Sequence, residues 1–151
     1  MIRLTDLLKE IGEASAKPFF TKDEIQDYDN DYGRHGSFET DSGLMVEYEF
    51  SDETDGGYTF VFSVEGSTQQ GKKTSVSEYL RIMASIYLVL IKFVEDYQPD
   101  YVKLTGDDKL GSTGQKNKIY SAYLEKNKSA LSKLGYQMEK NGSELLITSD
   151  N

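Results

Sequence analysis

The residues with the clearest chemical potential lie in the stretch VEGSTQQGKKTSVSEYL. Gly66, Gly71 and Lys72 have the spacing of a phosphate-binding loop, in which backbone N–H groups and a lysine hold phosphate oxygens. Lys73 stands where that loop requires a serine or threonine for magnesium, and Thr74 comes one residue too late. The preceding strands are also expected to be antiparallel, whereas nucleotide hydrolysis by this loop requires a parallel sheet. The sequence therefore argues against a nucleotide hydrolase.

A different anion site is compatible with the same loop. Ser75 and Glu78 have the spacing of a capping box, so a helix is expected to begin directly after the loop. Free N–H groups and the helix dipole favour anions at such a position. The candidate cofactor contacts are Gln70, Gly71, Lys72, Lys73, Thr74 and Ser75. The alternative interpretation is a polar loop that caps the helix and carries solvated lysines.

An acidic segment precedes the strands. Asp27, Asp29 and Asp31 are spaced like the first three ligands of a calcium loop. The glycine that should be sixth is seventh, at Gly33, and Glu39 is thirteenth instead of twelfth. We therefore predict no metal site. The three aspartates are instead the candidate surface for a protein partner, and a solvated acidic turn is the alternative.

Further candidate residues are scattered along the chain. His35 is the single histidine and would serve as a general base only with a fixed partner, so an exposed loop position is the simpler expectation. Asp107 and Asp108 follow an expected strand end, where α/β enzymes often place functional groups. Tyr120 and Tyr123 have the i, i+3 spacing of one helix face, which favours packing. The sequence assigns no catalytic residues, and it leaves open whether the protein is an enzyme.

Composition limits the function classes. The 151 residues suit one domain, 1–151, with a single core. A net charge of −9 argues against nucleic-acid binding and is compatible with a partner that has a basic surface. The absence of cysteine excludes disulfides and thiolate zinc sites. No apolar run is long enough to span a membrane, and we expect a reducing cytoplasmic environment.

Hydrophobic periodicity predicts the elements in the order α-β-β-β-α-β-α-β-β. Leu44, Val46, Tyr48 and Phe50 alternate with polar residues, as in a half-buried strand. Residues 21–36 are polar and turn-rich and are expected to form a loop with one helical turn. The expected helices are 5–14, 75–97 and 119–134, and the expected strands are 37–40, 44–50, 58–64, 136–139 and 144–148, with a further short strand and an acidic turn in 101–108.

These elements predict an α+β fold. The second half of the helix at 75–97 is apolar around almost its whole circumference, which predicts a central helix packed across an antiparallel sheet. Pro99 blocks its continuation. Gly135 is expected just past the end of the last helix, and Asn141 with Gly142 predicts a tight hairpin turn between the last strands.

The element order over residues 44–148 resembles the GNAT N-acetyltransferase superfamily. The segment IYSAYLEKNKSALSKLGYQME is similar to a LYEKLGF ending common there, most closely at Leu134, Gly135 and Tyr136. The resemblance implies a GNAT-like fold and acetyl-CoA bound by its pyrophosphate at the 66–75 loop. Asp107 and Asp108 would then lie near the transfer cleft, and Tyr120 or Tyr123 would protonate the departing thiolate.

The loop departs from the pattern of that superfamily. The superfamily has Q/R-x-x-G-x-G/A, where the glycines let the backbone approach phosphate closely. Here Gln69, Gln70 and Gly71 are followed by Lys72 and Lys73, which add bulk. The lysines would have to act as cationic phosphate contacts instead.

A second resemblance covers most of the chain. KPFF near the start, FVEDYQPDYVKLTGDD after the long helix and KIYSAYL followed by LGY are similar to small uncharacterised proteins encoded by bacteriophages. The resemblance implies a viral origin, with a location in the host cytoplasm or the virion.

Two functions follow from the sequence. The first is a non-enzymatic, acidic, phage-encoded protein-interaction module, either a virion component or a host-directed factor, which uses no cofactor. The alternative is a divergent GNAT-type N-acetyltransferase with acetyl-CoA at the 66–75 loop. The sequence leaves the oligomeric state open.

Overall fold

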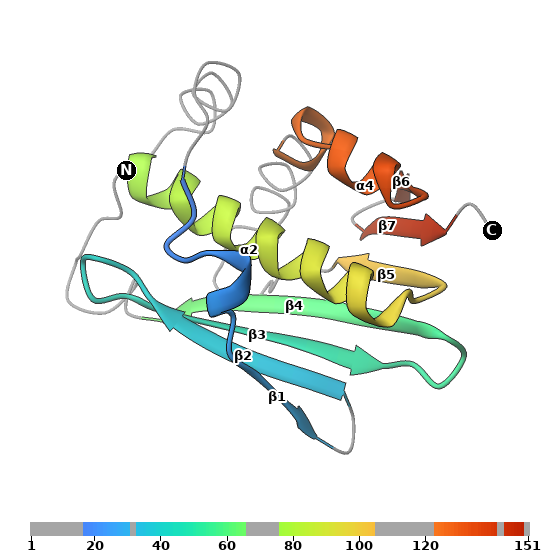
Figure 1. Ribbon diagram of the computed structural model, residues 1–151, viewed down its shortest axis with the longest axis horizontal. Helices are drawn as coiled ribbons and strands as arrows, with labels where there is room; N and C mark the ends of the chain where they lie inside the picture. Colours follow the sequence, from blue (N-terminus) through green and yellow to red (C-terminus); the bar gives the residue numbers. More distant parts are fainter. Residues whose placement is uncertain (1–16, 31–32, 66–75, 105–122, 142–143, 150–151) are drawn as a thin grey trace.

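The computed structural model describes residues 17–30, 33–65, 76–104, 123–141 and 144–149 (Figure 1). The helix expected at 5–14 lies outside these residues. The described elements are the 3-10 helix η1 (Lys22–Glu24), the helices α2 (Val76–Tyr97) and α4 (Ser129–Lys133), and the strands β1 (Asp27–Asn30), β2 (Gly33–Glu39), β3 (Met45–Asp52), β4 (Gly57–Glu65), β5 (Tyr101–Leu104), β6 (Tyr136–Asn141) and β7 (Glu144–Ser149).

The strands form a seven-stranded sheet in the order β1-β2-β3-β4-β5-β7-β6. Together with the helices, this confirms a mixed α+β fold. The expectation of an antiparallel sheet is wrong at one place, because β4 and β5 pair in parallel while the other neighbours are antiparallel. A parallel pair needs a crossover connection, and α2 supplies it between β4 and β5.

The segment 21–36 has the expected helical turn, η1, but the expectation of a loop elsewhere in it is wrong. It contains η1, the strand β1 and the start of β2, which begins at Gly33 rather than near residue 37. Asp27 pairs with Gly36 and Asn30 with Gly33 in a short antiparallel hairpin. Aspartate and asparagine have low strand propensity, so the local sequence favoured a loop. Pairing along the edge of β3 overrides that preference, because β2 is held by β3 over its whole length.

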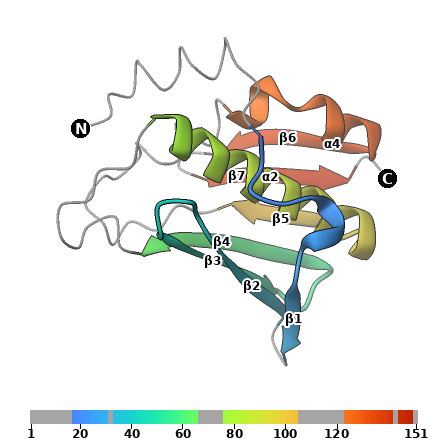
Figure 2. The same ribbon diagram turned by 60° about the vertical axis from the view of Figure 1, so that its left-hand side comes forward.

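The alternation predicted for the next strand is confirmed. Val46, Tyr48 and Phe50 of β3 are buried, whereas Glu47 and Glu49 are exposed. Successive side chains of a strand point to opposite faces, so the sheet has one apolar and one polar face in this half. Figures 1 and 2 show α2 over one face and no described helix over the other.

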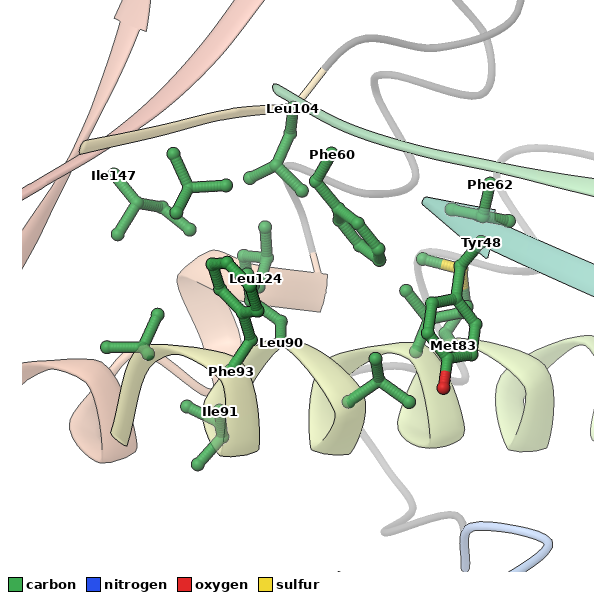
Figure 3. Packing of buried hydrophobic residues seen from close by; sticks show 14 of the residues in the cluster. Tyr48, Phe60, Phe62, Met83, Leu90, Ile91, Phe93, Leu104, Leu124 and Ile147 are labelled. Atoms are coloured by element: carbon green, nitrogen blue, oxygen red, sulfur yellow. The ribbon is translucent and has the colours of Figure 1, made fainter. Parts of the chain in front are cut away.

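The helix α2 contacts the sheet through aromatic rings. Phe93 stacks on Phe50 with ring centroids 3.8 Å apart and an interplanar angle of 4°, and Phe50 stacks on Phe60 at 4.4 Å. Figure 3 shows Phe60 and Leu104 pointing from the sheet toward α2, and Leu90 and Phe93 pointing from α2 toward the sheet. The helix ends at Tyr97, before Pro99, as the sequence predicted.

The helix expected at 119–134 is interrupted within its described part. Residues 123–126 are helical, a turn follows at Asn127 and Lys128, and α4 begins at Ser129. The hydroxyl of Tyr87 on α2 donates a hydrogen bond to the carbonyl of Asn127, and the Asn127 side chain donates to the Tyr123 carbonyl at 2.8 Å. These bonds satisfy backbone carbonyls at the interruption.

The last elements agree with their prediction. Gly135 has a φ of +85°, the left-handed conformation expected just after the end of a helix. β6 and β7 pair antiparallel from Tyr136 with Ser149 to Asn141 with Glu144. Gly142, in the predicted turn, lies outside the described residues. None of the helices in the described part is long and apolar enough to cross a membrane.

Candidate functional site

Two of the three aspartates proposed as a partner surface surround an arginine. Asp27 and Asp29 lie two residues apart on β1 and therefore on the same face of that strand. Arg34 of β2 places its Nε 2.6 Å from Asp27 Oδ1 and 3.5 Å from Asp29 Oδ1. Asp31 lies outside the described residues. The structure thus brings two predicted residues together and adds a cation that the sequence interpretation had not assigned to them.

The end of α2 joins this group. Arg34 Nη1 donates a hydrogen bond to the Tyr97 hydroxyl at 2.6 Å, and that hydroxyl donates to Asp29 Oδ1 at 3.0 Å. The guanidinium carbon lies 5.2 Å from the centroid of the Tyr97 ring, within cation–π range. Burial and the bond to Asp29 raise the pKa of Tyr97. We call Asp27, Asp29, Arg34 and Tyr97 the arginine cluster.

Tyr48, a buried residue of β3, contacts the arginine cluster through Asp27. Its hydroxyl lies 3.5 Å from Asp27 Oδ2 and passes over Gly36, where any Cβ would collide with it. Burial, followed by the charge of Asp27, raises the pKa of Tyr48 well above the usual range. The Asp27 side chain is only 13% exposed, against 71% for Asp29. Asp29 is therefore the more available of the two for a partner.

More carboxylates lie at the same end of the molecule, in the β3–β4 turn. Asp52 and Asp29 both raise the pKa of Tyr58, after the larger contribution of burial. Asp55 accepts a bond from the Tyr101 hydroxyl at 2.7 Å. That bond lowers the pKa of Asp55 and is the main cause that raises the pKa of Tyr101 to about 12.

The C-terminus of α2 contributes acids as well. Asp96 is exposed in its last turn, which contains no basic residue, and Asp100 follows and donates its backbone N–H to Gly56 in the β3–β4 turn. We call this surface the acidic end, made of Asp29, Asp52, Glu53, Asp55, Asp96 and Asp100. The sequence interpretation had assigned Asp27, Asp29 and Asp31 to a partner surface, and nothing in the sequence placed the end of α2 beside them.

A second feature is a groove on the open face of the sheet, with a volume of about 700 Å³. Its floor is built from side chains that point away from α2. The register aligns Tyr28, His35, Glu49 and Val61 across four strands. Ser37, Glu47 and Ser63 form the adjacent row, with Gln26 at its end.

His35 is placed differently from its prediction. It lies on β2 rather than in a loop, although it is exposed as expected. Its ring centroid is 6.2 Å from that of Tyr28, and Glu49 is its cross-strand neighbour. The sequence interpretation missed the groove as a site. The available signal was the alternation of Glu47 and Glu49 with buried residues, which placed both carboxylates on one face.

The candidate coenzyme contacts at 70–75 lie outside the described residues, as do Asp107, Asp108 and Tyr120. Tyr123 is described, and its ring meets Tyr87 edge to face at 5.8 Å. Burial raises the pKa of Tyr123. Packing between helices is thus the observed role of Tyr123, which agrees with the simpler of its two interpretations.

The described part of β5 ends at Leu104, so its pairing with β4 is described as far as Phe60. β4 itself continues to Glu65. This end of β4 leads into residues 66–75 and then into α2.

Metal binding finds no support in the described ranges. Nowhere in them do three or more histidine or carboxylate side chains gather in a geometry that could hold an ion. Comparisons of the chain with protein-family models, curated proteins and solved structures find no match. Its function therefore has to be inferred from the chemistry of its own surfaces.

Proposed function

We propose that this protein is a non-enzymatic interaction module that binds a protein partner with a basic surface. The observation that carries the proposal is the acidic end, where carboxylates of β1, the β3–β4 turn and α2 gather. Exposed charges of one sign steer and orient a partner of the opposite sign.

Unfavourable electrostatic interactions are expected among the carboxylates of the acidic end in the free protein. Asp96 lies in the last turn of α2, where the helix dipole favours cations and no basic residue is present, and its ion pair with Lys92 at 2.7 Å offsets only part of this effect. Like charges on neighbouring elements also repel one another. A basic partner would remove both penalties at once, which gives the charge arrangement a physical purpose.

The resemblance to small bacteriophage proteins supports a setting for this activity. A virion component would use the acidic end to bind another structural protein, and a host-directed factor would use it to bind a bacterial protein. Both settings require a stable protein–protein contact and no cofactor.

Capture of a partner from a bacterial lysate tests the proposal. The variant Asp29→Asn/Asp52→Asn/Asp96→Asn changes exposed positions of the acidic end and keeps side-chain size. A control with the same change in net charge is Asp23→Asn/Asp41→Asn/Glu125→Gln, at exposed positions elsewhere.

We expect the first variant to capture about tenfold less partner than the control, because each exposed charge pair contributes up to about 1 kcal/mol. Capture should also fall as salt rises, since screening shortens the range of the interaction. Equal capture by the two variants would show that the acidic end is not the binding surface.

A second candidate function is acetyl transfer from acetyl-CoA, as in the GNAT superfamily that the chain resembles. The observation that favours it is the position of the 66–75 loop, which follows the end of β4 at Glu65 and precedes α2 at Val76. An anion at that position would meet the positive end of the helix dipole. Lys72 and Lys73 would supply charge to the pyrophosphate.

Isothermal titration with acetyl-CoA distinguishes the two functions. Under the second candidate, acetyl-CoA binds with micromolar affinity, ATP with magnesium does not bind, and Lys72→Ala/Lys73→Ala loses the coenzyme. Lys126→Ala/Lys128→Ala removes the same charge at exposed positions and should keep it. No heat with acetyl-CoA would exclude the coenzyme and leave the interaction module.

A further inference from the structure

We propose that the groove on the open face of the sheet binds an extended segment of a partner protein that has lysines at alternate positions, Lys-x-Lys. The inference rests on the proposed function for the basic character of the partner. It concerns a different surface from the acidic end, so the two can fail separately.

The spacing of two carboxylates carries the inference. Glu47 and Glu49 are two residues apart on β3 and lie on the same exposed face. Two residues along a strand span about 6.6–6.8 Å. An extended peptide that runs along β3 has the same repeat, so lysines at alternate positions would place one ammonium group opposite each glutamate.

An aromatic wall adds a second contact for a cation. Tyr28 is 63% exposed, which is unusual for a large ring, and it lies on the same face as Glu49 in the row through His35. An ammonium group over the face of a tyrosine ring is attracted by the negative face of its π system. Tyr28 on β1 and Glu49 on β3 lie on either side of His35 on β2, so they offer a ring and a charge to different side chains of one bound segment.

The rest of the groove matches an extended polar segment. Of the described residues that line it, none is a lysine or an arginine. Gln26, Ser37 and Ser63 can hydrogen-bond the backbone of a bound peptide. A volume of about 700 Å³ accommodates several side chains, and α2 lies on the other face, so entry is open.

Two octapeptides of identical composition test the spacing. The probe is acetyl-(Lys-Ser)4-amide, and the control is acetyl-(Lys-Lys-Ser-Ser)2-amide, which carries the same charge with a different pattern. Titration calorimetry at about 50 mM salt keeps the electrostatic contribution measurable. We expect the alternating peptide to bind at least about fivefold more tightly, because only its lysines meet both glutamates at once.

Variants of the protein test the surface. Glu47→Gln/Glu49→Gln should weaken the alternating peptide about tenfold relative to Asp23→Asn/Glu125→Gln, which changes the net charge equally outside the groove. Tyr28→Leu should weaken it about threefold through loss of the cation–π contact. The exposed positions of these substitutions leave the fold intact, which circular dichroism would verify.

NMR supplies a direct readout of position. His35 is the only histidine, so its Cε1–H signal is unique, and it should shift on addition of the alternating peptide together with the amides of Tyr28, Glu49 and Val61. Amides near Glu125 should not move. Shifts confined to the acidic end, or equal binding by the glutamate variant and its control, would overturn the inference.

The remaining outcomes are also decisive. Equal affinity for the two octapeptides would show that the spacing of the lysines does not matter and would overturn the inference. If free spermidine binds as tightly as the alternating peptide, the groove does not select a protein segment, which would also overturn it. If the alternating peptide binds in the groove but the acidic-end variant captures its partner normally, the proposed surface at the acidic end fails while this inference stands.

Discussion

Truncation of Phe93 is the most direct test of the packing of α2 against the sheet. The ring is 4% exposed, stacks on Phe50 at 3.8 Å and meets Tyr58 at 4.9 Å and Tyr97 at 4.6 Å. Phe93→Ala removes this ring from a closely packed interior and leaves a cavity. Comparable truncations cost about 3–5 kcal/mol. A domain of this size has a free energy of unfolding of about 5–15 kcal/mol, so the variant should lose a large share of it.

A second substitution separates stacking from burial. Phe93→Leu keeps most of the apolar volume and loses the parallel ring contact with Phe50. Stacked aromatic pairs contribute about 0.5–1.5 kcal/mol beyond the area they bury. We therefore expect Phe93→Leu to lower the free energy of unfolding by about 1–2 kcal/mol, well short of the loss in Phe93→Ala.

Urea denaturation followed by circular dichroism measures both variants. The slope of unfolding free energy against urea should stay constant, so that a shift in midpoint reports stability. Tyr28→Ala, at an exposed ring on the other face, is the control and should cost less than about 1 kcal/mol. A loss below about 1 kcal/mol for Phe93→Ala would refute the packing of α2 on β3 through this ring.

Three further outcomes test single features. Gly135→Ala should cost about 1–2 kcal/mol through its positive φ alone, since no atom lies within 4 Å of the added Cβ, and an unchanged melting temperature would contradict the left-handed conformation. Arg34→Gln should lower the free energy of unfolding by about 1–3 kcal/mol, because it leaves Asp27 without its ion pair. The control Lys128→Gln removes an exposed ion pair and should cost under about 0.5 kcal/mol. Equal losses in the two variants would show that the arginine cluster contributes little to stability. The pKa of Tyr101 is raised to about 12 from an unfolded value of about 10, so its stabilisation is present below pH 10 and is lost between about pH 10 and pH 12. The urea midpoint should therefore decrease less from about pH 10 to about pH 12 in Tyr101→Phe than in the parent protein. An identical decrease in both proteins would exclude the hydrogen bond from Tyr101 to Asp55 as the cause.

Hydrophobic periodicity in the sequence was sufficient to predict those helices and strands whose pattern is strong. The alternation around Tyr48 predicts a strand and also which side chains are buried. The apolar run before Tyr97 predicts a helix, and the structure confirms its end before Pro99. Gly135 likewise has the backbone conformation that its position predicts. These features depend on residues close together in the chain, so local physical chemistry determines them.

Features that depend on distant pairing required the tertiary structure. Asp27 and Asp29 form a strand only because β2 and β3 hold them there, and their contact with Arg34 and Tyr97 joins residues more than sixty positions apart. Hydrophobic pattern carries no information about which strands become neighbours, so it predicted neither the parallel pairing of β4 with β5 nor the row that joins His35 to Glu49.

The sequence by itself therefore determined the α+β class, the polar and apolar faces of β3 and the acidic character of the protein. Only the tertiary structure decided which acids share a surface, because that depends on strand register and on where the end of α2 lies. Both candidate surfaces for a basic partner, the acidic end and the groove, arise from this long-range arrangement.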